Sequence, residues 1–191
     1  TTEEQKRNAE KCDEVGTALI DPLFLKPCYN EDKLSVLIHN TINEQRIKSN
    51  LQSISFDNKL GQIAKSHSMD MVIRNYYSHV SLDGLEFWDR YSQSGYLCEV
   101  IIGNIIYSGA ENIAQNALYD SYSPSVFGRS IIEWKTPEEI AHSIVLGDEP
   151  NQGWMNSAGH RKNILESFWN VEGIGVSIND EGLVYVTQNF C

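Results

Sequence analysis

The segment from Gly153 to Leu165 places a single imidazole at the expected start of a helix. Asn156 or Ser157 can serve as the N-cap, and an apolar run begins at Ile164, so His160 falls in the first helical turn. The first turn of a helix has free backbone N–H groups and the positive end of the helix dipole, and it binds anions and polar ligands well. This segment therefore predicts a helix that begins at a binding site.

Three other segments have the spacing or the capping residues of helices. From Asp32, apolar residues recur at helical spacing as far as Ile47 and predict a helix of about four turns. Asp57 is the expected N-cap of a second helix, and residues 136–139 (Thr-Pro-Glu-Glu) form a capping box with proline at the first helical position. The apolar face of the second helix consists of Leu60, Ile63, Ala64, His67 and Met71.

Two regions predict strands. Residues 96–107 are rich in Ile and Val, which favours a strand with a bulge near Gly103. Residues 175–178 and 183–190 flank a turn-rich segment and predict an antiparallel hairpin. Helices together with a short antiparallel sheet predict a domain of the α+β class.

The chain of 191 residues is 41% hydrophobic, which suits one core. We expect an N-terminal extension over residues 1–30 and one domain over residues 31–191. The formal net charge of −11 argues against nucleic acid as a partner and against adsorption to anionic lipid. No apolar run of about eighteen residues occurs, so no segment is expected to span a bilayer.

The four cysteines permit two disulfides in any of three pairings. We favour Cys12 with Cys28, which closes a loop in the extension, and Cys98 with Cys191, which ties the last residue to the domain. The alternative is four thiols in a cytosolic protein. The chain begins at Thr1 without a leader, which fits a mature or trimmed protein. We expect the protein to be secreted or extracellular.

Several short motifs follow one another in a fixed order. They are Ile42 to Arg46, Phe56 to Met71, Tyr76 to Arg90, Gly109 to Ala114 (Gly-Ala-Glu-Asn-Ile-Ala), the segment around His160, Gly173 to Val176, and Tyr185 to Phe190. The set resembles the prokaryotic branch of the CAP superfamily, which contains cysteine-rich secretory proteins, antigen 5 and plant pathogenesis-related proteins and shares the SCP domain. This resemblance covers roughly residues 34–190 and implies an α-β-α sandwich with a short antiparallel sheet between helical layers.

The resemblance also implies a cleft that collects two histidines and two glutamates. Three of the matching positions are His79, Glu111 and His160, whereas the fourth falls on Ser157, which has no carboxylate and would line the cleft. Two imidazoles, one carboxylate and a water would suit a divalent cation such as zinc. The alternative is a hydrogen-bonded pair of histidines in which Glu111 fixes one imidazole tautomer. His67 is expected to be a buried core residue rather than a ligand.

These residues predict a binding module for a small ligand, a lipid or a protein, and no catalytic residue is assigned. The second hypothesis is a metal-dependent hydrolase in which His79, Glu111 and His160 hold zinc and a nucleophilic water. The third is an extracellular scaffold whose partner docks on the acidic surface. A serine nucleophile is not favoured, because Ser157 is expected to cap a helix and the chain has no Gly-x-Ser-x-Gly or His-Glu-x-x-His motif.

Overall fold

The computed structural model describes residues 28–125 and 128–191. Its centre is a four-stranded sheet in the order β1, β7, β8, β4. The strands span Ser55–Phe56 (β1), Val171–Ile178 (β7), Leu183–Phe190 (β8) and Ala110–Ala117 (β4). Strand β1 runs parallel to β7, and the other pairs are antiparallel. The sheet is therefore mixed, with the predicted antiparallel hairpin at its centre.

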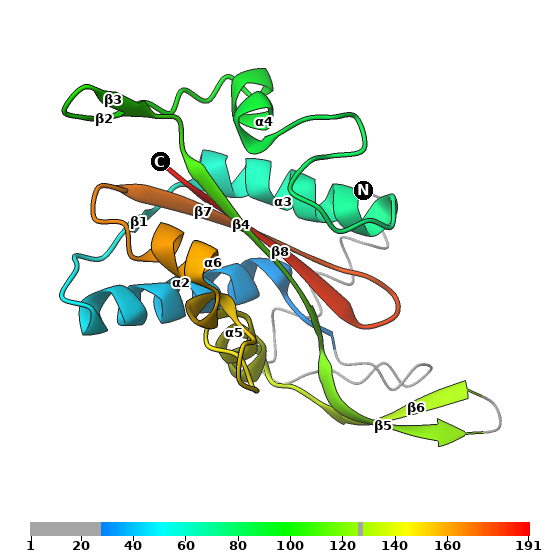
Figure 1. The fold of residues 1–191 in the computed structure, drawn as a ribbon. Coiled ribbons are helices and arrows are strands. Elements are labelled where there is room, and N and C mark those ends of the chain that lie inside the picture. Colours follow the sequence, from blue (N-terminus) through cyan, green and yellow to red (C-terminus); the bar gives the residue numbers. More distant parts are fainter. Residues whose placement is uncertain (1–27, 126–127) are drawn as a thin grey trace.

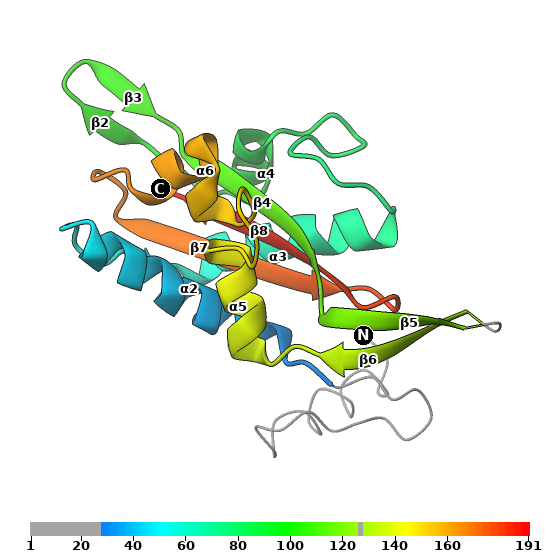
Figure 2. The ribbon, with the colours of Figure 1, turned by 60° about the horizontal axis from the view of Figure 1, so that its bottom comes forward.

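Helices cover both faces of this sheet (Figure 1). One face carries α3 (Asn58–Ile73), with α4 (Phe87–Gln93) beside it. The other face carries α2 (Glu31–Lys48), α5 (Pro137–Val145) and α6 (Ala158–Ile164), as Figure 2 shows from a second direction. The short 3₁₀ helix η1 (Trp154–Asn156) precedes α6. The α+β class and the layered α-β-α arrangement are confirmed.

The predicted helix starts are correct. The Asp57 side chain accepts a hydrogen bond from the backbone N–H of Leu60, and Thr136 and Glu139 form both bonds of a capping box. Ser157 occupies the N-cap position of α6, but its side chain makes no capping hydrogen bond. Local sequence therefore placed all three starts, although the cap of α6 lacks the expected bond.

Strand β7 and helix α3 touch through their backbones. An ideal Cβ atom on Gly175 would lie 1.9 Å from the backbone nitrogen of Lys65, and one on Gly173 would lie 2.2 Å from that of Gly61. Real Cβ atoms essentially never come this close to another heavy atom. The absence of side chains at these two positions is therefore what allows the helix to approach the sheet so closely.

The prediction of one bulged strand over residues 96–107 is wrong. The chain instead forms a hairpin of β2 (Val100–Ile102) and β3 (Ile105–Tyr107), and Gly103 at the turn has a φ of 62°. A second ribbon, β5 (Tyr119–Ser125) with β6 (Gly128–Trp134), was not predicted at all. Both ribbons extend from the body of the domain (Figures 1 and 2).

The predicted disulfide between Cys98 and Cys191 is present, with 5.6 Å between the two Cα atoms. The other predicted pair involves Cys12, which lies outside the described residues. Residues 1–27 lie there too, so the domain boundary at residue 30 stays a prediction. Within the described residues, no helix has both the length and the apolar composition that crossing a membrane requires.

Candidate functional site

Strand β4 forms one edge of the central sheet and carries Glu111 and Asn112. Successive residues of a strand point to opposite faces, and these two side chains do so. Glu111 contacts Arg90 of α4, whereas Asn112 contacts the backbone of His160 in α6. Strand β4 therefore lies between α4 with its preceding loop on one face and α6 on the other. The predicted site residues come from both sides of this strand.

The Glu111 side chain is completely buried, and an arginine neutralises it. Its Oε2 accepts a hydrogen bond of 2.5 Å from Nη2 of Arg90, which is itself 9% exposed. A buried carboxylate is costly unless it is paired and hydrogen-bonded. Arg90 thus supplies the charged partner that a buried carboxylate at Glu111 requires.

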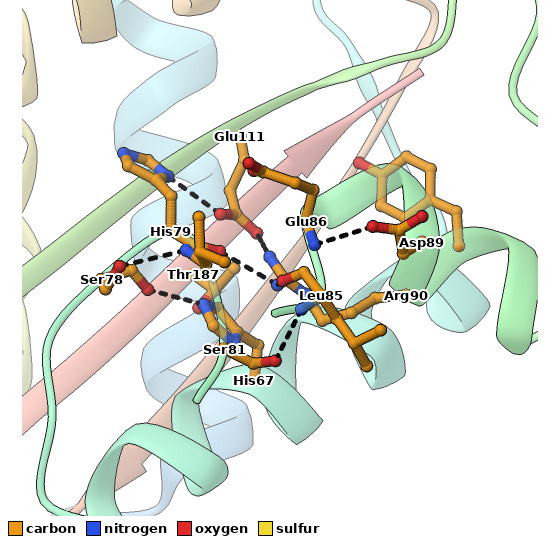
Figure 3. Close-up of polar contacts among 12 residues, drawn as sticks. His67, Ser78, His79, Ser81, Leu85, Glu86, Asp89, Arg90, Glu111 and Thr187 are labelled. Atoms are coloured by element: carbon orange, nitrogen blue, oxygen red, sulfur yellow. Dashed lines mark hydrogen bonds and ion pairs between the residues drawn. The ribbon is translucent and has the colours of Figure 1, made fainter. Parts of the chain in front are cut away.

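Arg90 also fixes the chain segment that leads to α4. Its Nη1 donates to the carbonyl oxygens of His79, at 3.0 Å, and Leu85, at 2.8 Å. One guanidinium therefore joins α4, the loop before it and strand β4, as Figure 3 shows. The sequence analysis included Arg90 in a motif but gave it no role.

His79 presents a fixed imidazole to the surface. Its Nδ1 donates to Oε1 of Glu111 over 2.9 Å. Because the carboxylate only accepts, the proton of the neutral ring lies on Nδ1, and Nε2 keeps a lone pair. In Figure 3 the second ring nitrogen points away from Glu111, and the side chain is 46% exposed. The Glu111 contact predicted for a hydrogen-bonded cleft is therefore present.

His67 of α3 holds the loop segment that carries His79. It is 1% exposed, and its Nε2 donates to the carbonyl oxygen of Ser78 over 3.0 Å. Burial lowers the pKa of His67, and the charge of Arg90 lowers it further. The expectation of a buried core histidine is confirmed, and this residue helps to position its neighbour in the loop.

His160 lies on the other side of β4, in α6. Nδ2 of Asn112 donates to the carbonyl oxygen of His160 over 3.2 Å, and Nδ2 of Asn163 donates to Oδ1 of Asn112 over 2.9 Å. Burial lowers the pKa of His160, and a positive charge on His79 lowers it further. The two imidazoles are therefore close enough to interact electrostatically, although the sequence separates them widely.

The described residues offer limited support for a metal centre. None of their His, Cys, Asp and Glu side chains gather in groups of three or more that could hold a metal ion. Each oxygen of Glu111 already accepts a hydrogen bond, from His79 or from Arg90. As arranged, both oxygens of this buried carboxylate are directed at His79 and Arg90, whereas catalytic zinc typically has three protein ligands. The zinc site of His79, Glu111 and His160 stays a prediction from the resemblance.

Ser157 immediately precedes α6 and is partly buried. In the described part of the chain, no hydrogen bond joins its hydroxyl to His160, so it lacks the base contact of an activated nucleophile. Its role in lining the cleft stays a prediction.

A second polar network, which the sequence analysis missed, supports the same region. The fully buried carboxylate of Glu172 accepts hydrogen bonds of 2.5 Å from Nδ1 of His39 and from Nε2 of Gln188. Gln188 in turn accepts a bond of 2.9 Å from Asn112. These side chains link α2 to β4, the strand that carries Glu111, along the face of the sheet that α2 and α6 cover.

We expect the domain to lose stability as the pH falls from about 7.5 to about 5.5, partly because of His160 and His67. The folded-state pKa of each histidine lies below its ordinary value. As the pH falls through the ordinary histidine pKa of about 6.5, the unfolded chain therefore takes up protons first, and unfolding becomes more favourable. Above that pH the His67 and His160 side chains are neutral in both the folded and the unfolded chain, and the effect is absent.

Denaturant unfolding at a series of pH values tests this expectation. His160→Gln should flatten the pH dependence, whereas His142→Gln, which replaces an exposed histidine of α5, serves as the matched control. Parallel loss of stability in the wild type and His160→Gln would show that His160 does not contribute.

Comparisons with known proteins agree with this architecture. Two Bacillus subtilis proteins are similar in sequence: uncharacterized membrane protein YlbC, 29% identical over 148 residues, and uncharacterized protein YkwD, 31% identical over 147 residues. The matches cover 78% and 76% of this chain but 31% and 42% of those proteins. The chain thus spans less than half the length of either relative.

Solved structures share the fold. An extracellular SCP-domain protein from Bacillus anthracis superposes with a TM-score of 0.55 and 27% identity, over 84% of this chain and 41% of that chain. An outer surface protein from Borrelia burgdorferi gives a TM-score of 0.58 over 85% of this chain and 94% of that chain, and its 15% identity shows similarity of fold alone.

The family model for CAP, the cysteine-rich secretory protein family, matches residues 39–190. This range includes His79, Glu111 and His160. It also includes α4, α6 and strand β4 between them. The chain therefore belongs to the CAP family of cysteine-rich secretory proteins.

Proposed function

We propose that this CAP domain is a secreted binding module whose ligand is held between His79 and His160. The observation that carries the proposal is the fixed, half-exposed imidazole of His79, whose Nδ1 is bound to the buried Glu111–Arg90 pair. In the neutral form of that ring Nε2 offers a lone pair, and burial lowers the pKa of His160, which favours a neutral second imidazole near pH 7. Such a pair suits an occupant that accepts electron pairs, namely a hydrogen-bond donor group or a divalent cation.

A binding role agrees better than hydrolysis with the bonds of Glu111. A hydrolase of the predicted kind needs a water activated by a cation or a free general base. Here both carboxylate oxygens are engaged by Arg90 and His79. Binding at the imidazoles requires no rearrangement of this buried pair.

One observation favours a metal-dependent hydrolase as the second candidate. The Glu111–His79 pair has the arrangement in which a carboxylate stands behind a metal-binding histidine and orients its ring. In that case His79 and His160 would hold the cation and Glu111 would position His79. Zinc would then supply a bound water of lowered pKa.

Secretion is supported by two findings. The Cys98–Cys191 bond suits an oxidising compartment, and the Bacillus anthracis protein of similar fold is described as extracellular. One of the relatives is named a membrane protein, which would fit an exported protein that remains at the cell surface.

Zinc titration by calorimetry near neutral pH, on metal-stripped protein, tests the site. We expect saturable one-to-one binding that weakens at least about tenfold in His79→Ala and in His160→Ala. His142→Ala, in exposed α5 sequence, is the matched control and should bind as the wild type does. Undiminished binding in both site variants would locate the cation elsewhere.

Activity assays on the wild type separate the two candidate functions. A hydrolase should turn over a model ester, lose this activity with a chelator and regain it with zinc. A binding module should show no turnover with or without zinc. If the wild type binds no zinc, a zinc ligand and the zinc-dependent hydrolase are both excluded. NMR titration of the His79 and His160 ring signals with hydrogen-bond donor fragments then tests whether the two imidazoles bind a donor group.

A further inference from the structure

The β2–β3 hairpin carries an apolar surface that the cleft does not use. Residues 100–107 include no charged residue, and the hairpin extends away from the body of the domain (Figures 1 and 2). Exposed apolar patches of this kind usually mark an interaction site. The exposed fractions of its isoleucines are 64% (Ile101), 45% (Ile102), 57% (Ile105) and 60% (Ile106).

Both faces of the hairpin are apolar. Ile101 is paired with Ile106, and Ile102 is paired with Ile105. Because side chains alternate along a strand, one pair lies on each face of the ribbon. A flat protein surface could cover only one of these pairs, whereas a fluid apolar phase would surround both.

The base of the hairpin is held firmly by the domain. Tyr107 packs against Phe168, with ring centroids 4.5 Å apart, and against Trp169. Just before the hairpin, Cys98 is bonded to Cys191. The domain therefore holds the apolar tip outward, so little conformational freedom would be lost when the tip is buried in another phase.

We propose that the β2–β3 hairpin is a membrane-contact element that inserts its four isoleucines into the surface of a neutral phospholipid bilayer. Each strand has three residues, a length of roughly 10 Å, which matches the 5–10 Å depth of interfacial insertion. Among residues 28–125 and 128–191, no strand pairs with either outer edge of this two-stranded sheet. At this depth the unpaired backbone groups of the hairpin remain within reach of headgroups and water, which can form hydrogen bonds with them.

Charge and area both favour neutral lipid over other occupants. The net charge of −11 opposes anionic headgroups but not zwitterionic ones. A second copy of the chain is less suitable, since the four side chains offer on the order of 400 Å² per copy, about half of what each partner buries in a stable interface. Insertion into lipid needs no complementary surface.

Two further apolar side chains lie beside the hairpin base. Trp88 is 48% exposed and Leu97 is 79% exposed. They line a surface hollow of about 450 Å³ that also includes Glu99 and Ser108, the residues that flank the hairpin. Tryptophan is enriched at the membrane–water interface, so Trp88 is placed to contact the headgroup layer when the tip inserts.

Vesicle flotation with pure phosphatidylcholine vesicles tests the proposal. The wild type should float with the vesicles, and it should continue to do so in about 1 M salt, where screening weakens ionic attachment. Ile101→Thr with Ile105→Thr changes one side chain on each face, keeps a β-branched residue at each position, and should reduce partitioning at least about tenfold. Adding phosphatidylserine should weaken binding of the wild type.

The matched control is Ile47→Thr with Ile73→Thr, which replaces isoleucines that are 60% and 72% exposed at the ends of α2 and α3. It should float as the wild type does, and unfolding curves should show that both double variants are folded. The proposal is wrong if the wild type stays unbound or if the two double variants lose binding equally. It is also wrong if sedimentation shows a wild-type dimer that the hairpin variant abolishes.

Discussion

Gly175→Ala should lower the free energy of unfolding by more than about 3 kcal/mol, above the usual range for overpacked cores. The added Cβ would lie 1.9 Å from the backbone nitrogen of Lys65 and 2.3 Å from the carbonyl carbon of Ala64. Neither atom belongs to a side chain that can rotate away. Helix α3 would have to move off β7, and His67, which supports the site, would move with it.

Denaturant unfolding measures this effect, and Gly159→Ala provides the matched control. Gly159 lies within α6, and a Cβ there would meet nothing within 4 Å. In a helix interior alanine is favoured over glycine by roughly 0.5–1 kcal/mol, so this variant should be as stable as the wild type or slightly more so. Equal stability of the two variants would show that α3 and β7 are not packed as tightly as described.

Arg90→Ala should destabilise the domain by about 3–5 kcal/mol, the usual result of leaving a buried charge without its partner. The Glu111 side chain is completely buried and, among the partners that the described residues provide, would keep only the hydrogen bond from His79. The carbonyl oxygens of His79 and Leu85 would lose their donor as well. We therefore expect a lower unfolding midpoint and a mobile His79 ring.

Two further variants distinguish the buried charge from a simple loss of packing. Arg90→Met combined with Glu111→Leu removes both charges and should recover much of the lost stability. Arg74→Ala removes an arginine that pairs with Asp70 and Asp83 at the surface, and it should change stability little. If the double variant is no more stable than Arg90→Ala, the cost does not come from the unpaired carboxylate.

The two networks on either side of β4 suggest how the site keeps its shape. Arg90 and Glu111 position His79 from the α3 face, whereas Asn112 and Asn163 position the turn of α6 that holds His160 from the other face. Each imidazole is thus supported independently, while both lie near one edge strand. A change on one face should shift one histidine and leave the other in place.

The sequence by itself determined the features that depend on a few neighbouring residues. The caps at Asp57 and Thr136 involve backbone groups three residues away, so local pattern was sufficient. The Cys98–Cys191 bond and the family were also predicted correctly, the latter from the order of several motifs. The apolar run at residues 96–107 led to the wrong prediction of a single strand. The reason is that β propensity indicates extended chain but not the point at Gly103 where the chain reverses.

Only the tertiary structure decided how the site residues are used. Glu111 and His79 are 32 positions apart, and Arg90 reaches Glu111 from a separate helix. No sequence period joins these segments, so the resemblance could name His79, Glu111 and His160 but not the role of Arg90. Which basic side chain pairs with the buried carboxylate of Glu111 depends on where folding places α4 against β4. That placement results from packing across the whole core, and it left Glu111 bonded to Arg90 and His79 in this structure.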